Sequence, residues 1–337
     1  MPAMTAASKP AAASPSTLAQ IYASVADPLQ QVEQLLRQQL QSQQPYVDEL
    51  CRYGCLLGGK RLRPVLVLLS ARACGPIQPD HLTLATVLEM IHTATLVHDD
   101  VLDGATTRRH LATVNSRWDN EASILLGDLL FSQAFYLASS LDDVFACRAI
   151  GRATNRVCEG ELRQKGTRGD FRLTEAEYLS IIEAKTAELC ACSCLLGAHY
   201  AAADATTSER LERYGRYLGI AFQIADDILD LVGREETTGK SLGTDLQQQK
   251  PTLPLIRMLQ TVDAVTRQQI LQMATSDHRD TYQSLRQLLQ QSTAIDYAQQ
   301  QARHYAAQAA SQLDGLFMND ALDHLHSLTR FAVHRVA

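Results

Sequence analysis

Two clusters of aspartates are the residues of this 337-residue chain whose types and spacing suit chemistry. Asp99, Asp100 and Asp103 follow an apolar run, residues 91–97, and on an α-helix Asp99 and Asp103 share one face. Carboxylates this close repel each other, and the negative end of the helix dipole adds to the cost. Hard divalent cations such as Mg²⁺, which prefer oxygen ligands, would relieve that repulsion.

A short acidic motif of this kind can also be a solvated helix end, but here it occurs twice. Asp226, Asp227 and Asp230 repeat the spacing after a second apolar helical run, residues 218–225. Two such helices can face each other across a cavity and hold several Mg²⁺ ions between them. The repetition favours a metal site over a chance motif.

Compact basic groups predict what the metals would hold. Residues 58–64 read GGKRLRP, and Arg108 and Arg109 follow the first acid cluster. An ordinary Gly-Gly turn with solvated charges is the alternative, but two glycines beside three cations suit a phosphate cradle. Acidic and basic clusters together predict a polyanionic ligand, bound through metal and directly.

Composition limits the class of protein. The formal net charge is −6, and no basic tail is present, which argues against a nucleic-acid partner. No apolar run approaches the roughly 20 residues that span a bilayer, and no signal peptide is evident, so a cytoplasmic protein without a transmembrane segment is expected. Cys190, Cys192 and Cys194 alternate along an expected helix, and we interpret them as buried small residues.

The elements that must position these residues are helices. One is expected from about Asp80 to just before Gly104, another from the Thr174 capping box to about Ala201, and a third over residues 208–231. Residues 1–17 are rich in Ala, Ser and Pro and are expected to be a disordered lead-in. No alternating strand is evident, so the prediction is an all-α fold: residues 18–337 form one large helical bundle around a central cavity.

With these motifs together, the chain resembles the trans-isoprenyl diphosphate synthases, or polyprenyl synthetases, from about residue 27 to its end. The resemblance rests on GGKRLRP at 58–64, IHTATLVHDDVLD at 91–103, RR at 108–109, KT at 185–186, FQIADDILD at 222–230, and GKSLGTD with KPTLP at 239–254. The sequence departs from the family pattern at His110, where a glycine is usual, and residues 104–107 lack the acids often found there. Neither change removes an expected ligand.

The resemblance implies an isoprenoid synthase fold and a Mg²⁺-dependent prenyltransferase, with three ions bound alongside substrate. The expected metal ligands are Asp99, Asp100, Asp103, Asp226, Asp227 and Asp230. Catalysis is assigned to Asp99, Asp100, Asp103, Lys185, Asp226, Asp227 and Lys240. The allylic diphosphate would contact Arg108, Lys185, Thr186, Gln223 and Lys240, and isopentenyl diphosphate would contact Lys60, Arg63, His92 and Arg109. Gly59 and Lys250 are further expected substrate-binding residues.

In this family an aromatic residue one turn below the first aspartate tends to stop chain growth early. Ala94 and Thr95 are small there, so the resemblance implies a product longer than farnesyl diphosphate, with Phe131 or Phe135 as candidates for a deeper floor. The family further implies a homodimer and a product that can be delivered to a membrane.

Three other classes of protein fit these motifs less well. A class I terpene cyclase would not need GGKRLRP or a second DDxxD. A non-catalytic subunit of a two-component synthase would have lost acids or lysines. A pure interaction protein would not need six paired aspartates.

Overall fold

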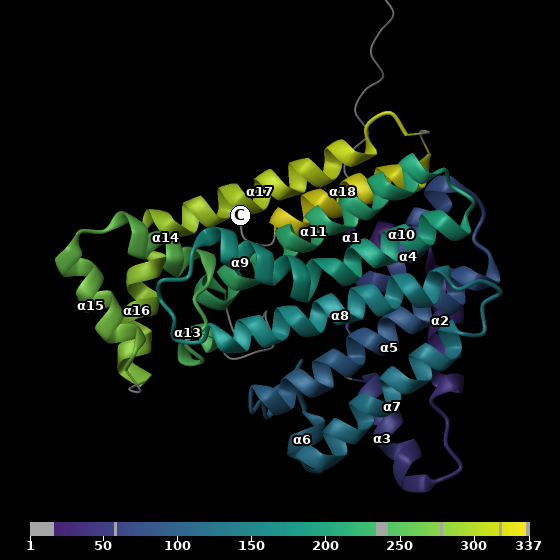
Figure 1. The fold of residues 1–337 in the computed structure, drawn as a ribbon, viewed down its shortest axis with the longest axis horizontal. Helices are drawn as coiled ribbons and strands as arrows, with labels where there is room; N and C mark the ends of the chain where they lie inside the picture. Colours follow the sequence, from purple (N-terminus) through teal and green to yellow (C-terminus); the bar gives the residue numbers. More distant parts are fainter. Residues whose placement is uncertain (1–16, 57–58, 234–241, 277–278, 317–318, 335–337) are drawn as a thin grey trace, which may run out of the picture.

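The computed structural model describes residues 17–56, 59–233, 242–276, 279–316 and 319–334 (Figure 1). The lead-in expected at residues 1–17 lies outside these ranges except for Thr17, and so do Gly58 and Lys240. Within the ranges the chain is overwhelmingly helical, which confirms the all-α prediction.

The helices are α1 (Leu18–Ala23), α2 (Ala26–Gln39), α3 (Pro45–Leu56), α4 (Leu62–Cys74), α5 (Pro79–Leu102), α6 (Val114–Arg117), α7 (Asn120–Ala138), α8 (Phe145–Gly166), α9 (Glu175–Ile182), the π-helix η1 (Glu183–Ala187), α10 (Glu188–Tyr200), α11 (Ala205–Val232), α13 (Thr244–Gln247), α14 (Leu253–Thr261), α15 (Ala264–Ala274), α16 (Arg279–Gln290), α17 (Thr293–Leu313) and α18 (Asp320–His334). None of these helices combines the length and apolar character needed to cross a membrane.

Helix α5 runs through the middle of the bundle and carries the first aspartate cluster at its end. It packs against α2, α4, α7 and α10, and residues 84–91 are buried on every side of the helix. A helix buried all round is mostly apolar all round, which is why the run before Asp99 shows no continuous polar face; Glu89 is the one buried charge in residues 84–91. The chain turns away at Gly104, whose φ of 62° suits glycine.

Close helix packing behind the site depends on small residues. A Cβ on Gly197 of α10 would lie 2.4 Å from the carbonyl oxygen of Val67 on α4, and one on Gly215 of α11 would lie 2.4 Å from the carbonyl oxygen of Cys190. Cys190, Cys192 and Cys194 are buried and unbridged. Their interpretation as small core residues is therefore confirmed.

One turn of the predicted helix from Thr174 to Ala201 is wider than an α-helix. The Thr174 capping box forms as predicted, but η1 separates α9 from α10 and carries Lys185 and Thr186. Glycines of two other helices flank this turn. A Cβ on Gly160 of α8 would lie 2.7 Å from the Lys185 backbone nitrogen, and one on Gly219 of α11 would lie 2.5 Å from the Ala187 Cα. The two glycines make room for the wide turn, and such turns recur at functional sites.

A short hairpin follows α5 where no strand was expected. Strands β1 (Thr107–Arg108) and β2 (Leu111–Ala112) pair antiparallel, with Arg109 and His110 at the turn between them. Both turn residues have positive φ, 53° and 65°, as a two-residue hairpin of the I′ type requires. Runs of two residues are too short to show a pattern of alternation, which is why the hairpin could not be predicted.

The role of Gly160 can be tested against a second glycine of α8. Replacing Gly160 with Ala should destabilise the protein by about 1–3 kcal/mol, because the new methyl group overlaps η1. A Cβ on Gly151, on the same helix, would have nothing within 4 Å of it. Gly151→Ala should therefore stabilise the protein by about 0.5–1 kcal/mol through helix propensity. Urea unfolding of both variants checks this, and equal effects would contradict it.

Candidate active site

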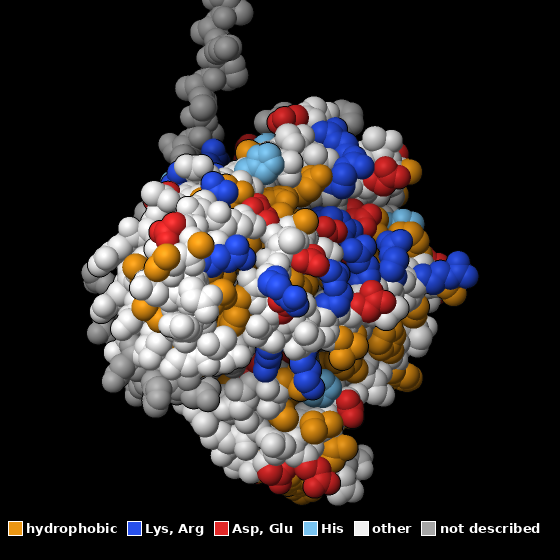
Figure 2. Space-filling model, turned by 60° about the vertical axis from the view of Figure 1, so that its left-hand side comes forward, with side chains coloured by type: hydrophobic (Ala, Val, Ile, Leu, Met, Phe, Trp, Pro, Cys, Tyr) orange, Lys and Arg blue, Asp and Glu red, His pale blue; other side chains and the backbone are white. Residues whose placement is uncertain are grey.

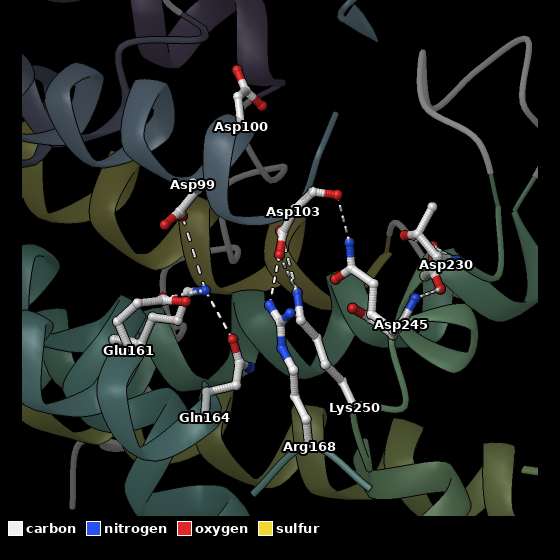
Figure 3. Close-up of polar contacts among 12 residues, drawn as sticks. Asp99, Asp100, Asp103, Glu161, Gln164, Arg168, Asp230, Asp245 and Lys250 are labelled. Carbon is white, nitrogen blue, oxygen red and sulfur yellow. Dashed lines mark hydrogen bonds and ion pairs between the residues drawn. The ribbon is translucent and has the colours of Figure 1, made fainter. Parts of the chain in front are cut away.

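The aspartates at the end of α5 point in different directions. Asp99 and Asp103 face α8 and the loop before α14, whereas Asp100 projects to the opposite side of α5 (Figure 3). This is the divergence expected for neighbours on a helix, and it gives each carboxylate its own set of partners.

Asp100 forms a buried ion pair with Arg108. The Arg108 Nε lies 2.9 Å and 3.0 Å from the two carboxylate oxygens, and its Nη2 lies 2.7 Å from Oδ1. Both side chains are almost fully enclosed. The pair fastens the hairpin to α5 and neutralises one charge of the cluster.

Asp99 faces a lysine from η1. The Lys185 Nζ lies 3.9 Å from Asp99, 2.5 Å from Glu161 and 2.9 Å from the Gln164 side-chain oxygen. Burial raises the pKa of Asp99 to about 6, with Lys185 opposing the rise and Glu161 adding to it. The charged form of Asp99 is therefore destabilised in the free protein, which favours any further cation that reaches it.

Asp103 is held by two cations from distant parts of the chain. Arg168 donates from Nη2 at 2.8 Å, and the Lys250 Nζ lies 3.3 Å from both carboxylate oxygens. Lys250 is itself buried. This arrangement joins α5 to the loop after α8 and to the loop before α14, as Figure 3 shows.

The second aspartate cluster lies on α11. Asp226 is exposed, while Asp227 is buried and accepts hydrogen bonds from the Tyr178 hydroxyl at 2.6 Å and from Gln223 at 2.7 Å. Burial raises the pKa of Asp227 well above its usual range, and the charge of Asp245 adds to the rise. Gln223 also accepts a hydrogen bond from the Thr186 hydroxyl at 2.7 Å, which links α11 to η1.

Asp230 caps a neighbouring helix. It accepts hydrogen bonds from the backbone nitrogens of Thr244 and Asp245 at 3.3 Å and 3.2 Å, and from the Thr244 hydroxyl at 3.0 Å. A carboxylate at a helix N-terminus is favourably placed. In this arrangement Asp230 orders α13 rather than facing Asp99.

A pocket lies between these elements. It is lined by Gln164, Thr167, Leu173, Tyr178, Ile181, Ile182, Lys185, Thr186, Gln223, Asp227, Asp245, Lys250, Pro251 and Thr252. Four predicted substrate-binding side chains, those of Lys185, Thr186, Gln223 and Lys250, therefore share one pocket.

The second predicted phosphate site is formed by Gly59 and Arg63 around the start of α4, by His92 of α5 and by Arg109 of the hairpin. The Arg109 guanidinium lies against Gly59, where any Cβ would be 2.2 Å from its Nη2. Arg63 has a buried Nε with no hydrogen-bond partner among the described residues. Burial and the charges of Arg63 and Arg109 hold the pKa of His92 well below its usual range. These groups suit an anion, with His92 as a neutral hydrogen-bonding group.

The donor set fits hard divalent cations bound together with an anion. In the described part of the chain no three His, Cys, Asp or Glu side chains come close enough together to hold a metal by themselves. Lys185, Arg168, Lys250 and Arg108 instead balance the carboxylates. On the face in Figure 2, basic and acidic side chains are likewise interleaved. Carboxylate oxygens suit Mg²⁺, and a diphosphate would supply the missing oxygen ligands.

Several residues of the site were not among those predicted from the sequence. Glu161, Gln164 and Arg168 lie on α8 and its following loop with spacings of three and four residues, which places them along one helix face. That row of polar side chains was a local signal of a functional face. Tyr178 and Asp245 reach Asp227 only through tertiary folding. No local pattern indicates Tyr178, and Asp245 ends the GKSLGTD motif without a local sign of its relation to Asp227.

The residues predicted to set product length occupy different environments. Ala94 is fully buried, and Thr95 is half-buried with its hydroxyl bonded to the His92 carbonyl oxygen at 2.8 Å. Phe131 packs against the buried core, while Phe135 is 36% exposed on α7. The roles of all four residues stay predictions.

Comparison with known proteins identifies relatives along most of the chain. The polyprenyl synthetase family pattern matches residues 44–292. An octaprenyl diphosphate synthase from Haemophilus influenzae is 35% identical, over 92% of this chain and 95% of its own. An all-trans-nonaprenyl-diphosphate synthase (geranyl-diphosphate specific) from Rhodobacter capsulatus is 35% identical, over 94% and 97%.

A solved structure shows the same fold. The polyprenyl synthase from Caulobacter crescentus, complexed with calcium and isoprenyl diphosphate, superposes with a TM-score of 0.90 at 35% identity, covering 97% of this chain and 100% of that one. The family and fold predicted from the sequence are thus confirmed, and the chain belongs to the polyprenyl synthetase family of prenyltransferases.

Proposed function

We propose that this enzyme condenses isopentenyl diphosphate with an allylic diphosphate to make all-trans polyprenyl diphosphates longer than farnesyl diphosphate. One observation carries the proposal. Lys185, Thr186, Gln223, Asp227 and Lys250 line one pocket, and its two lysines pair with Asp99 and Asp103 at the end of α5. Arg63, His92 and Arg109 form a second, cationic site. A condensation of two diphosphates requires two sites that each bind a diphosphate anion.

The allylic diphosphate is proposed to bind at the first pocket. Lys185 and Lys250 already lie beside Asp99 and Asp103, so a diphosphate entering between them can accept hydrogen bonds from both lysines. Arg108, Thr186 and Gln223 complete the proposed contacts. Lys240 is proposed for the same diphosphate but lies outside the described residues.

Mg²⁺ is proposed as the metal, with three ions bound in the presence of substrate. The proposed ligands are Asp99, Asp100, Asp103, Asp226, Asp227 and Asp230. The carboxylates of Asp100, Asp103, Asp227 and Asp230 are bonded to protein groups in the structure, so metal binding is proposed to replace part of those bonds. Bound Mg²⁺ would offset the negative charge that grows on the leaving diphosphate.

Isopentenyl diphosphate is proposed to bind at Gly59, Lys60, Arg63, His92 and Arg109. The buried Nε of Arg63 supports this, because a buried donor without a partner favours an incoming acceptor. Neutral His92 would donate or accept a hydrogen bond without adding charge.

The chemistry follows from charge. Ionisation of the allylic C–O bond gives an allylic cation, the double bond of isopentenyl diphosphate attacks it, and a proton is lost. No described side chain is positioned as an obvious base. The departed diphosphate is therefore the proposed proton acceptor.

Two other classes of function are less favoured. A terpene cyclase would have no use for the second cationic site. A non-catalytic subunit would lack acids or lysines, whereas Lys185, Lys250 and both aspartate clusters are present.

A single catalytic domain over residues 18–337, acting as a homodimer, is also proposed. The three apolar clusters of the core share bordering residues, which supports one domain.

Helix α7 exposes several apolar side chains, which supports a partner surface; they are Ile124, Leu125, Leu129 and Tyr136. Sedimentation at twice the chain mass would support the dimer, and the monomer mass would contradict it. Free cysteines are consistent with the proposed cytoplasmic location, which cell fractionation can test.

The activity is tested with purified protein, Mg²⁺, labelled isopentenyl diphosphate and a series of allylic primers. A product ladder ending at one length beyond farnesyl, abolished by EDTA, is expected. Asp99→Ala and Asp226→Ala should each reduce turnover by about 10²-fold or more. Glu209→Ala, which removes an exposed acid paired with Arg213 near the start of α11, is the control and should leave turnover unchanged. No elongation with any primer would contradict the proposal, and cyclised hydrocarbon would favour a terpene cyclase.

Product length is tested at the wall below Asp99. Ala94→Tyr places an aromatic ring where a small buried side chain now lies, so the dominant product should become shorter. Chromatography of the dephosphorylated products measures this, and the rate of the first condensation controls for damage to the site. An unchanged product distribution with an intact first condensation would place the floor elsewhere.

A further inference from the structure

Arg61 belongs to the predicted phosphate cradle but its side chain is engaged elsewhere. Its Nε forms an ion pair with Glu33 of α2, its Nη1 lies 2.9 Å from Glu89 of α5, and its Nη2 donates to the Cys55 carbonyl oxygen at 3.3 Å. Only 12% of the side chain is exposed. Arg61 therefore ties the loop before α4 to three helices.

The backbone at Arg61 makes a sharp reversal at the same point. Its φ of 53° and ψ of 38° are left-handed, an uncommon conformation for a residue with a side chain. Such a conformation persists when the surroundings hold it in place. The ion pairs of Arg61 anchor its side chain at this reversal.

Glu89 is the buried acid beside this cluster of cations. It lies on α5 one turn before His92, with 2% of its side chain exposed, and its charge acts on Arg61, Arg63 and Arg109. Three guanidinium groups this close repel one another. A buried carboxylate among them lowers that repulsion while no diphosphate is bound.

We propose that Glu89 and Arg61 are positioning residues for the isopentenyl diphosphate site. The pair fixes the loop of residues 59–63 so that Lys60 and Arg63 are held ready for the substrate, and Glu89 offsets the repulsion between the arginines. Neither residue touches the substrate. The inference rests on the proposed function of that site.

The variants Arg61→Gln, Glu89→Gln and the double variant test the pair by steady-state kinetics. The KM for isopentenyl diphosphate should rise about tenfold in each, and no further in the double variant, because residues acting as a unit are not additive. The KM for the allylic primer should change less than about twofold, since Arg61, Glu89 and their partners Glu33 and Cys55 do not line its pocket. A general loss of structure would raise both values together.

A matched control lies on α4. Arg72 forms an ion pair with Asp320 at the far end of that helix, so Arg72→Gln should leave both KM values unchanged. Removing one partner of a buried ion pair leaves the other charge uncompensated and can prevent folding. The double variant removes both charges together, so its KM values decide the test if a single variant does not fold.

The outcomes separate the two proposals. An unchanged or lowered KM for isopentenyl diphosphate in active variants, or equal rises in both KM values, would overturn the inference alone. No elongation by the wild-type protein would overturn the proposed function and this inference with it.

Discussion

Repulsion between carboxylates at the end of one buried helix is the constraint on which the rest of the structure depends. The aspartates of α5 lie where the helix dipole is least favourable to them. Cations from other parts of the chain form ion pairs with these carboxylates: Arg108 from the hairpin, Lys185 from the π turn, and Arg168 and Lys250 from loops. Each partner comes from a different element, so the bundle must be complete before the site exists.

The same logic explains two local departures from regular structure. The π turn places Lys185 and Thr186 beside Asp99 and Gln223, and glycines on α8 and α11 give it the space. The hairpin brings Arg108 back to Asp100 through two left-handed residues. In both places an unusual backbone serves to deliver a cation or a hydrogen bond to a fixed carboxylate.

Much of this arrangement could be predicted from local sequence. The helix carrying Asp99 was expected from about Asp80 to before Gly104 and runs over Pro79–Leu102, because its caps and its apolar run are local signals. The π turn could not be predicted, since the glycines that permit it lie on two other helices. Tyr178 and Asp245 could not be predicted for the same reason: their relation to Asp227 exists only after folding.

In the proposed function, protein cations balance these carboxylates until a diphosphate binds together with metal, and metal binding tests this proposal most directly. The measurement is equilibrium dialysis with Mn²⁺ as a Mg²⁺ substitute, with and without an unreactive allylic thiolodiphosphate. We expect weak, non-saturating Mn²⁺ binding to the protein alone and tight, saturable binding when the analogue is present. Tight, saturable binding of Mn²⁺ without any diphosphate would contradict this view of the site.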